Sequence, residues 1–194
     1  MKIIGISGGT GAGKSLVCAE LKKRGAAIID ADEISRRVSR SDGCAYAELV
    51  EFFGSGILQD SGEIDRRELG RIVFSDPEKL AELNRITHKH IFAEMKREID
   101  GCTAQIAVLD VPLLFQSDFP FDCDLTVAIV AQPEVRLSRI MARDGISRDA
   151  AEARMRNQMP DEEYARLADM CADNSKGVEE IPKIVDMIIK EVTK

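Results

Sequence analysis

The sequence has 194 residues, of which 44% are hydrophobic, and its formal net charge is −7 at pH 7. This length is sufficient for one domain with a real hydrophobic core. The negative charge argues against a general nucleic-acid-binding protein, because phosphate contacts would need basic groups confined to one cleft. An anionic ligand must therefore be bound by a local group of residues.

Five cysteines are scattered along the chain without a C-x-x-C pair: Cys18, Cys44, Cys102, Cys123 and Cys171. This pattern favours small, buried, reduced thiols over a disulfide framework or a metal cage. The apolar stretch at residues 3–6 is too short to cross a membrane, and the glycine-rich residues after it have no signal-peptide character. We expect a soluble cytoplasmic protein, a monomer or weak homo-oligomer, with no membrane or nucleic-acid partner.

The predicted elements alternate between strand and helix. Residues 2–7 form the first predicted strand, and a helix follows Lys14; residues 26–30 form the second strand, and a helix follows Ala31. Both strands are rich in β-branched residues and nearly continuous in apolar character. This is typical of a parallel sheet that helices cover on both faces.

The segment from about 41 to 101 differs from the rest, because its pattern is mostly helical. Its clearest helix has Pro77 in the first turn and Gly101 as the stop. The alternating pattern then resumes. Two further strands are predicted at residues 105–110 and 125–130, and two further helices follow Pro133 and Val178. We therefore predict an open parallel α/β sheet with a helical insertion.

The stretch "GGTGAGKS", residues 8–15, matches the pattern G-x-x-x-x-G-K-[ST] and lies between the first predicted strand and helix. Its glycines let backbone N–H groups approach phosphate oxygens, and the helix N-terminus adds partial positive charge. Lys14 can reach the β- and γ-phosphates, and the Ser15 hydroxyl can ligate Mg²⁺. The alternative is a glycine-rich turn without a ligand, but the full motif in this context favours nucleotide binding.

Acidic residues follow two predicted strands, at the edge where open α/β sheets bind ligands. Asp30 ends the second strand, and Asp32 lies just beyond it at the start of a helix. A carboxylate at Asp32 can accept or orient the proton of an attacking hydroxyl, or it can be a helix cap. Asp110 ends the third strand, where it can serve a nearby Mg²⁺ or simply be solvated.

Arg136, Arg139 and Arg143 recur at spacings of three and four, so they share one helix face. A charged face of this kind is often only solvated. Near a phosphate-binding loop, however, guanidinium groups can clamp phosphoryl oxygens, and Gly145 offers a pivot toward a second arginine-bearing helix. The segment is a candidate lid, whose closure would exclude competing water.

Six segments together resemble the dephospho-CoA kinase family across essentially the whole chain: "GISGGTGAGKS", "IIDADEISRR", "LNRITHKHI", "DVPLLF", "RDGISRDAAEARMRNQMPDEE" and "ADNSKG". The combination of the loop with DAD and PLLF makes the resemblance specific. It implies a P-loop kinase fold, with a three-layer open parallel sheet, a helical acceptor-binding insertion and a lid. The implied core covers about 1–40, 102–143 and 168–194, the insertion about 41–101, and the lid about 144–167.

The resemblance also implies the activity, which is ATP- and Mg²⁺-dependent phosphorylation of the ribose 3′-hydroxyl of dephospho-coenzyme A to give coenzyme A and ADP. The implied catalytic residues are Lys14, Asp32, Arg139 and Arg143. Those implied for ATP are Gly11, Ala12, Gly13, Lys14, Ser15, Leu16 and, near the adenine, Asn174. Those implied for the acceptor are Asp32, His88, Leu113 and Phe115, and those for Mg²⁺ are Ser15 and Asp110.

The chain departs from the family pattern at two positions, with Lys89 in place of a proline and Gln116 in place of a glutamate. Both departures bear on acceptor docking around His88 and Phe115 and leave the phosphate chemistry untouched. His88 and His90 also suggest a metal site, but positions two apart on a helix point to different faces.

Three other functions share some of these features. A small-molecule kinase of the nucleoside monophosphate or shikimate type has the same loop and lid and differs in the acceptor pocket. A GTP-driven switch lacks its usual guanine contacts, because the chain has no D-x-x-G or N-K-x-D pattern. A nucleotide-binding scaffold without turnover stays open.

Overall fold

The computed structural model describes residues 1–112, 114, 115 and 119–194. By backbone contacts it divides into two compact units. The first unit contains Met1–Ile29 and Cys102–Lys194, and the second contains Asp30–Gly101.

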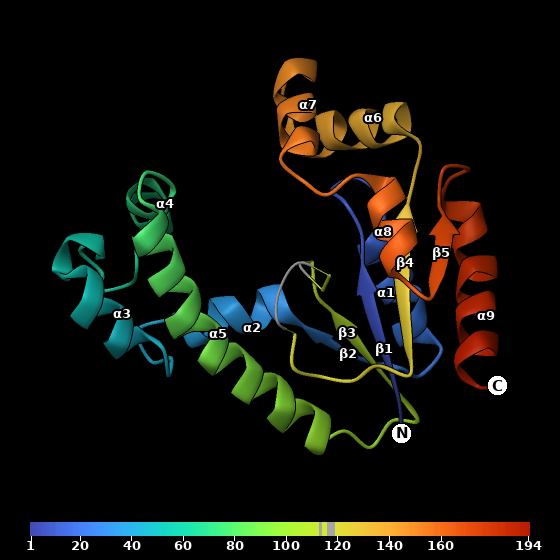
Figure 1. Cartoon of the computed structure of the whole chain (residues 1–194), viewed down its shortest axis with the longest axis horizontal. Helices are drawn as coiled ribbons and strands as arrows, with labels where there is room; N and C mark the ends of the chain where they lie inside the picture. Colours follow the sequence, from blue (N-terminus) through green and yellow to red (C-terminus); the bar gives the residue numbers. More distant parts are fainter. Residues whose placement is uncertain (113, 116–118) are drawn as a thin grey trace. The chain divides into compact units, whose positions relative to one another are not determined.

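Five strands form one sheet in the order β2-β3-β1-β4-β5 (Figure 1). Their bounds are Lys2–Ser7 (β1), Ala27–Asp30 (β2), Ile106–Asp110 (β3), Leu125–Val130 (β4) and Met170–Asp173 (β5). β1 pairs in parallel with β3 and with β4, and β4 pairs in parallel with β5. The chain continues on one side of β1 through β2 and β3 and on the other through β4 and β5. The carboxyl end of β1 therefore lies at the topological switch point, where such sheets bind ligands.

The four strands predicted from sequence are confirmed, but β5 was missed. Its four residues, "MCAD", include no β-branched residue and are mixed in polarity, so they carry little strand signal. The strand exists because parallel pairing to β4 satisfies its backbone groups. The predicted α/β class with a parallel sheet is confirmed.

The helices follow the predicted starts closely. α1 begins at Lys14 and α6 at Pro133, while α5 runs from Pro77 and is capped at Gly101. The α-helices are Lys14–Lys23 (α1), Ala31–Val38 (α2), Tyr46–Phe53 (α3), Arg66–Phe74 (α4), Pro77–Asp100 (α5), Pro133–Asp144 (α6), Arg148–Arg156 (α7), Asp161–Leu167 (α8) and Ile181–Val192 (α9). Short 3₁₀ turns cover Ser55–Ile57 (η1) and Val178–Glu180 (η2).

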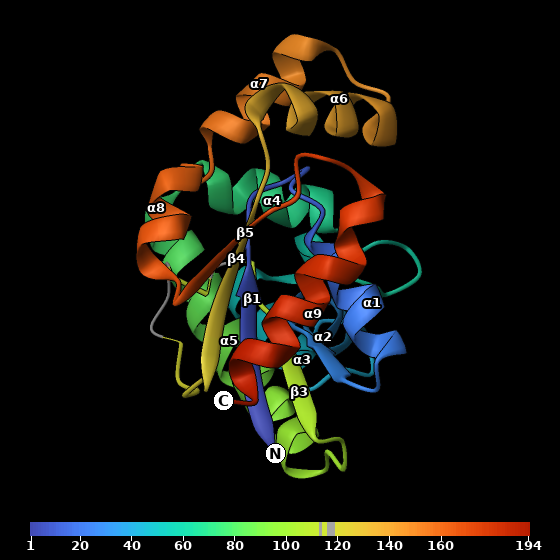
Figure 2. The same cartoon turned by 90° about the vertical axis from the view of Figure 1, so that its right-hand side faces the viewer.

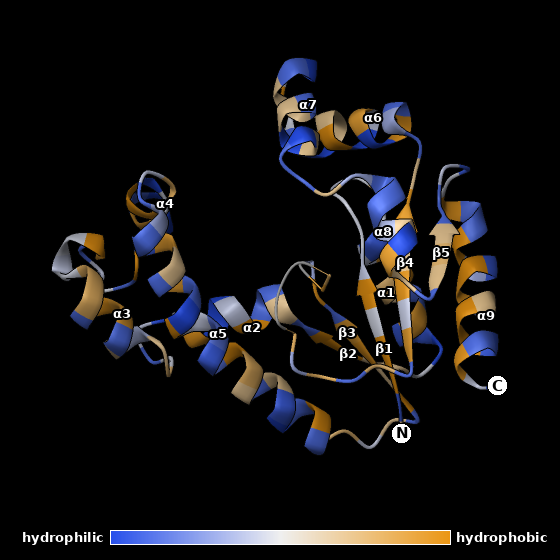
Figure 3. Cartoon of the chain, viewed as in Figure 1, coloured by the Kyte–Doolittle hydropathy of each residue, from blue (hydrophilic) through white to orange (hydrophobic). Residues whose placement is uncertain are grey.

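The core of the first unit lies between the sheet and the pair α1 and α9, which pack together on one face (Figure 2). Ile4 and Ile6 of β1 point into this core, as alternate residues of a strand do. The intervening residues Gly5 and Ser7 face the other side, where Tyr164 of α8 is buried. Helices thus cover both faces of the sheet, and its strands β3 and β4 are accordingly mostly apolar (Figure 3).

The second unit is helical, and α2, α3 and α4 each pack against the long helix α5. Three of its helices begin at an aspartate whose carboxylate accepts backbone N–H groups of the first turn: Asp30, Asp65 and Asp76. Such caps satisfy N–H groups that have no partner within the helix. The assignment of this region to acceptor binding, and of 144–167 to a lid, stays a prediction.

The five cysteines are all free thiols, but only Cys18 is buried. Cys44 and Cys171 are exposed, and Cys102 and Cys123 are half-buried. The expectation of small buried thiols is therefore right for Cys18 alone, because the others lie on loops and edge elements rather than in the core. Within the described residues, we find no helix whose length and apolar character would suit a membrane span.

Candidate active site

The loop of residues 8–13 connects the carboxyl end of β1 to the N-terminus of α1, and two of its glycines leave no room for a side chain. Gly13 has φ 95° and forms the N-terminal boundary of α1; a Cβ there would lie 2.1 Å from Nδ2 of Asn174. Gly11 has φ 78°, and a Cβ there would lie 2.8 Å from the carbonyl oxygen of Arg136. Only glycine combines a positive φ with so close an approach.

Several backbone N–H groups of this loop are available to a ligand. Those of Gly11, Gly13 and Ser15 have no acceptor among the described residues. They gather at the N-terminus of α1, where the helix dipole adds partial positive charge. Unpaired N–H groups at a helix N-terminus suit the oxygens of a phosphate group, as the motif predicts.

Lys14 and Asp110 form an ion pair at this loop. Asp110 ends β3 and Lys14 begins α1, and the side chains are only 8% and 15% exposed. The thiol of Cys18 lies 3.5 Å from the second carboxylate oxygen of Asp110, to which it donates. Solvation as a strand-end residue is therefore the wrong interpretation of Asp110. Its role toward Mg²⁺ stays a prediction.

The arginines of α6 are directed at the loop. Arg139 donates to the carbonyl oxygens of Gly11 (3.3 Å) and Ala12 (3.4 Å), and to that of Asn174 (2.9 Å). Arg136 is only 4% exposed. The interpretation as a solvated face is thus wrong for these two residues. It holds better for Arg143, which is exposed and pairs with Asp144, although it also donates to the hydroxyl of Thr10 at 3.3 Å.

Asn174 follows β5 and is completely buried. Its amide nitrogen donates to the carbonyl oxygen of Ala12 at 2.8 Å, while its Oδ1 has no partner among the described residues. The structure therefore brings Asn174 to the loop, as a group that holds the backbone at Ala12. Its predicted place near the adenine stays a prediction.

Asp30 and Asp32 lie in the second unit. The carboxylate of Asp30 accepts the N–H groups of Asp32 (2.8 Å) and Glu33 (3.0 Å), so Asp30 is the cap of α2. Asp32 lies in the first turn and is exposed. The alternative of Asp32 as the helix cap is therefore wrong, because the helix already begins at Ala31.

The predicted acceptor residues are spread over different elements. His88 of α5 is half-buried with its ring centroid 5.4 Å from that of Phe92, and burial lowers the pKa of its imidazole. Phe115 packs edge-on against Tyr164 at 6.3 Å. Leu113 and Gln116 lie outside the described residues. The role of each of these residues stays a prediction.

The two histidines have different surroundings, as their spacing predicts. His90 lies 2.8 Å from the carboxylate of Glu48, which Lys89 also contacts at 2.8 Å, whereas His88 lies beside Phe92. Within the described part of the chain, no group of three or more His, Cys, Asp or Glu side chains could hold a metal ion. Lys89, one of the departures from the family pattern, thus forms a surface ion pair within the second unit.

An open parallel sheet with a phosphate-binding loop at its switch point, and with a lysine and arginines directed at that loop, defines the class of P-loop kinases. Comparison with known proteins then identifies the family. The dephospho-CoA kinase family model matches residues 2–180. The chain belongs to the dephospho-CoA kinase family, whose members catalyse the final step of coenzyme A biosynthesis. It is therefore a phosphotransferase with an alcohol group as acceptor.

Individual relatives agree with the family model. A dephospho-CoA kinase of Carboxydothermus hydrogenoformans is 43% identical over 182 residues, which is 92% of this chain and 88% of that protein. A crystal structure from Thermus thermophilus, 34% identical, matches with a TM-score of 0.87 over 100% of this chain and 98% of that one. The dephospho-CoA kinase of Campylobacter jejuni, 27% identical, gives a TM-score of 0.69 over 99% and 98% of the two chains.

Two residues that the structure brings to the loop or its arginine have no signal in the sequence. Gln158 and Asp161, which follow α7 and begin α8, reach the loop or its arginine. Neither belongs to a pattern that predicts a role in phosphate binding. Only their position in the segment "RDGISRDAAEARMRNQMPDEE", part of the family resemblance, could have drawn attention to them.

Proposed function

We propose that the chain transfers the γ-phosphoryl group of ATP to the 3′-hydroxyl of the ribose of dephospho-coenzyme A. In this reaction a bond forms between the hydroxyl oxygen and the γ-phosphorus, and the bond from that phosphorus to the bridging oxygen of ADP breaks. The observation that supports it best is the loop in this family context, with unpaired N–H groups at Gly11, Gly13 and Ser15 among the described residues.

The loop and its neighbours bind and orient the donor in this proposal. The N–H groups of residues 11–16 hold phosphate oxygens, and the ammonium of Lys14 moves from Asp110 onto the β- and γ-phosphates. Arg139 and Arg143 stabilise the negative charge of the transferring group. Asn174, which holds the backbone of Ala12, contributes to the adenine site in this proposal.

Oxygen donors near the loop fit a magnesium ion. The hydroxyl of Ser15 and the carboxylate of Asp110 are hard ligands of the kind that Mg²⁺ takes in kinases. When bound, the ion neutralises negative charge on the phosphates. Asp110 is available for this once Lys14 has transferred its hydrogen bond to phosphate.

Asp32 accepts or orients the proton of the acceptor hydroxyl in this proposal, with His88, Leu113 and Phe115 contributing to acceptor binding. Two observations support Asp32: its carboxylate is not the cap of α2, and the side chain is exposed and accessible to a substrate. We further propose that the protein works in the cytoplasm, as a monomer or weak homo-oligomer. All five of its thiols are free, as a reducing compartment favours.

A coupled assay for ADP release tests the proposed function. With MgATP, release is expected to depend on added dephospho-coenzyme A and to yield coenzyme A in equal amount. A nucleoside monophosphate and shikimate serve as acceptor controls and should support little turnover. Equal ADP release without any acceptor, or equal turnover with a control acceptor, would contradict the proposal.

A further inference from the structure

Thr10 belongs to the phosphate-binding loop, and its N–H and C=O are both held by side chains from distant segments. Its N–H donates to Oε1 of Gln158 at 2.7 Å, and its carbonyl oxygen accepts from Nε of Arg136 at 2.9 Å. Gln158 is 148 residues away in sequence and lies between α7 and α8.

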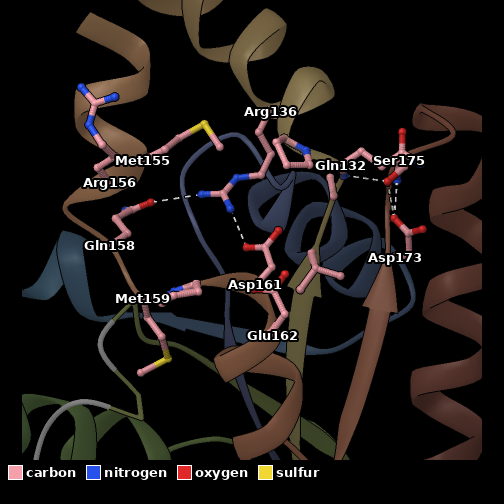
Figure 4. A pocket seen from close by; sticks show the side chains of 14 residues that line it. Gln132, Arg136, Met155, Arg156, Gln158, Met159, Asp161, Glu162, Asp173 and Ser175 are labelled. Carbon is pink, nitrogen blue, oxygen red and sulfur yellow. Dashed lines mark hydrogen bonds and ion pairs between the residues drawn. The ribbon is translucent and has the colours of Figure 1, made fainter. Parts of the chain in front are cut away.

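The guanidinium of Arg136 contacts both Thr10 and Gln158. Besides its bond to Thr10, its guanidinium pairs with Asp161 at the start of α8 and lies 3.4 Å from Oε1 of Gln158 (Figure 4). The side chain is 5% exposed, so its position is fixed by the surrounding protein. A planar guanidinium donates in fixed directions, and one group can therefore orient the loop carbonyl and the glutamine oxygen together.

The bonds of Thr10 contrast with those of the residues that follow it. Gly11, Gly13 and Ser15 have N–H groups without acceptors among the described residues, while the N–H of Thr10 is satisfied by the protein. The loop is thus held from outside at Thr10 and left open on the side that receives phosphate. A loop rich in glycine has high conformational entropy, so such an anchor lowers the entropy lost on nucleotide binding.

We infer that Gln158 is a positioning residue, whose amide oxygen holds the phosphate-binding loop in its nucleotide-binding conformation through the N–H of Thr10. The inference rests on the proposed function, because it assigns the open side of the loop to the phosphates of ATP. Gln158 belongs to the predicted lid segment, so its hydrogen bond connects that segment to the loop. Arg136 orients Gln158 and does not itself need to reach the nucleotide.

The test replaces Gln158 while sparing Arg136. Gln158→Met keeps the length of the side chain and removes the acceptor, whereas Gln158→Glu keeps an acceptor oxygen. Gln132→Met is the matched control, because Gln132 is an exposed glutamine that lines the same pocket of about 550 Å³. Its side chain makes no hydrogen bond among the described residues, so its loss should leave the loop unchanged.

Three measurements are made on each variant: the exchange rate of the Thr10 amide hydrogen by NMR, the Kd for ADP by calorimetry, and steady-state kinetics. For Gln158→Met we expect faster Thr10 exchange and a rise of about three- to tenfold in the Kd for ADP and the KM for ATP. The kcat and the melting temperature should change little, since the side chain is exposed. Gln158→Glu should retain slow Thr10 exchange, and Gln132→Met should match the wild type.

Unchanged Thr10 exchange in Gln158→Met, or an unchanged Kd for ADP, overturns the inference. So does a drop in kcat and melting temperature with KM unaltered, because that pattern indicates only a structural role. The exchange and calorimetry readouts do not need catalysis. If the wild type shows no acceptor-dependent turnover, the proposed function fails, while these two readouts still decide the role of Gln158.

Discussion

Lys14 and Asp110 form an ion pair at the phosphate-binding loop, although 96 residues separate them in sequence. The lysine that the motif assigns to phosphate therefore has a carboxylate as its ion-pair partner. In the proposed reaction, phosphate replaces Asp110 as the partner of Lys14, and this exchange leaves the carboxylate of Asp110 open to a cation. The pair also makes each residue important for stability, because both side chains are largely buried.

Lys14→Ala is expected to remove most phosphoryl transfer and also to destabilise the fold. The loss of the lysine leaves the carboxylate of Asp110, 6% exposed, without its cationic partner, which costs about 3 kcal/mol. Adding Asp110→Asn should restore much of the stability but not the turnover. Urea unfolding and ADP release measure the two effects.

Lys23→Ala is a suitable control for this pair, because Lys23 is exposed and forms a surface ion pair with Glu20. The free energy of unfolding of the Lys23→Ala variant should differ from that of the wild type by no more than about 0.5 kcal/mol. Near-normal turnover in folded Lys14→Ala would contradict the assignment of the loop to catalysis.

Asp32→Asn should lower kcat by about 10²-fold and leave the KM for ATP and the stability near their wild-type values. The lower part of the usual range for a general base is expected, since a loose phosphoryl transition state needs little early proton transfer. Kinetics with ATP and dephospho-coenzyme A varied separately measure the effect. A kcat within about threefold of wild type would be too small for a general base.

Asp30 provides the complementary change, because it caps α2. Asp30→Ala should cost about 1 kcal/mol of stability, while Asp30→Asn should retain most of the cap and most of the activity. Asp30→Asn with a kcat as low as that of Asp32→Asn would show that the effect is not specific to Asp32.

Saturating MgATP with acceptor should slow backbone hydrogen exchange around Gly145, which connects α6 and α7 with φ 64°. The reason is closure of the arginine-bearing segment over the phosphates. Arg139→Ala removes bonds to the carbonyl oxygens of Gly11, Ala12 and Asn174, so it should reduce both the protection and the turnover. Mass spectrometry of exchanged peptides, with and without ligands, makes the comparison. Unchanged protection, together with wild-type turnover in Arg139→Ala, would contradict a lid.

The stability of the protein should fall as the pH is lowered through about 6.5 and below, in part because of His88. Burial lowers the pKa of its imidazole in the folded state, so between that value and 6.5 the unfolded chain binds more protons. The contribution of neutral His88 to the stability of the fold is complete above the pKa of the imidazole in the unfolded chain. It is lost as the pH falls toward the lower pKa of the folded state. Urea unfolding at pH 7.5 and 5.5 should therefore show a smaller difference for His88→Gln than for the wild type. An equal difference in both would contradict the assignment.

Local patterns were sufficient for most of the elements. Continuous apolar runs predicted β1 to β4, and Pro77 and Gly101 predicted the two ends of α5. These features depend on backbone hydrogen bonding and side-chain periodicity over a few residues. β5 was not predicted, because "MCAD" has no such pattern and becomes a strand only by pairing with β4.

Local sequence patterns were enough to predict the parallel α/β class, the glycine-rich loop at residues 8–15 and the acidic residues at the strand ends. The tertiary structure decided what these groups contact. It paired Lys14 with Asp110, made Asp30 rather than Asp32 the cap of α2, and brought Gln158 to Thr10. Strand order and helix packing determine which distant side chains meet, and a local pattern carries no information about that order. The charge of a residue does not predict its burial either. Arg136 and Arg143 lie on the same helix face, yet packing against α8 buries only Arg136.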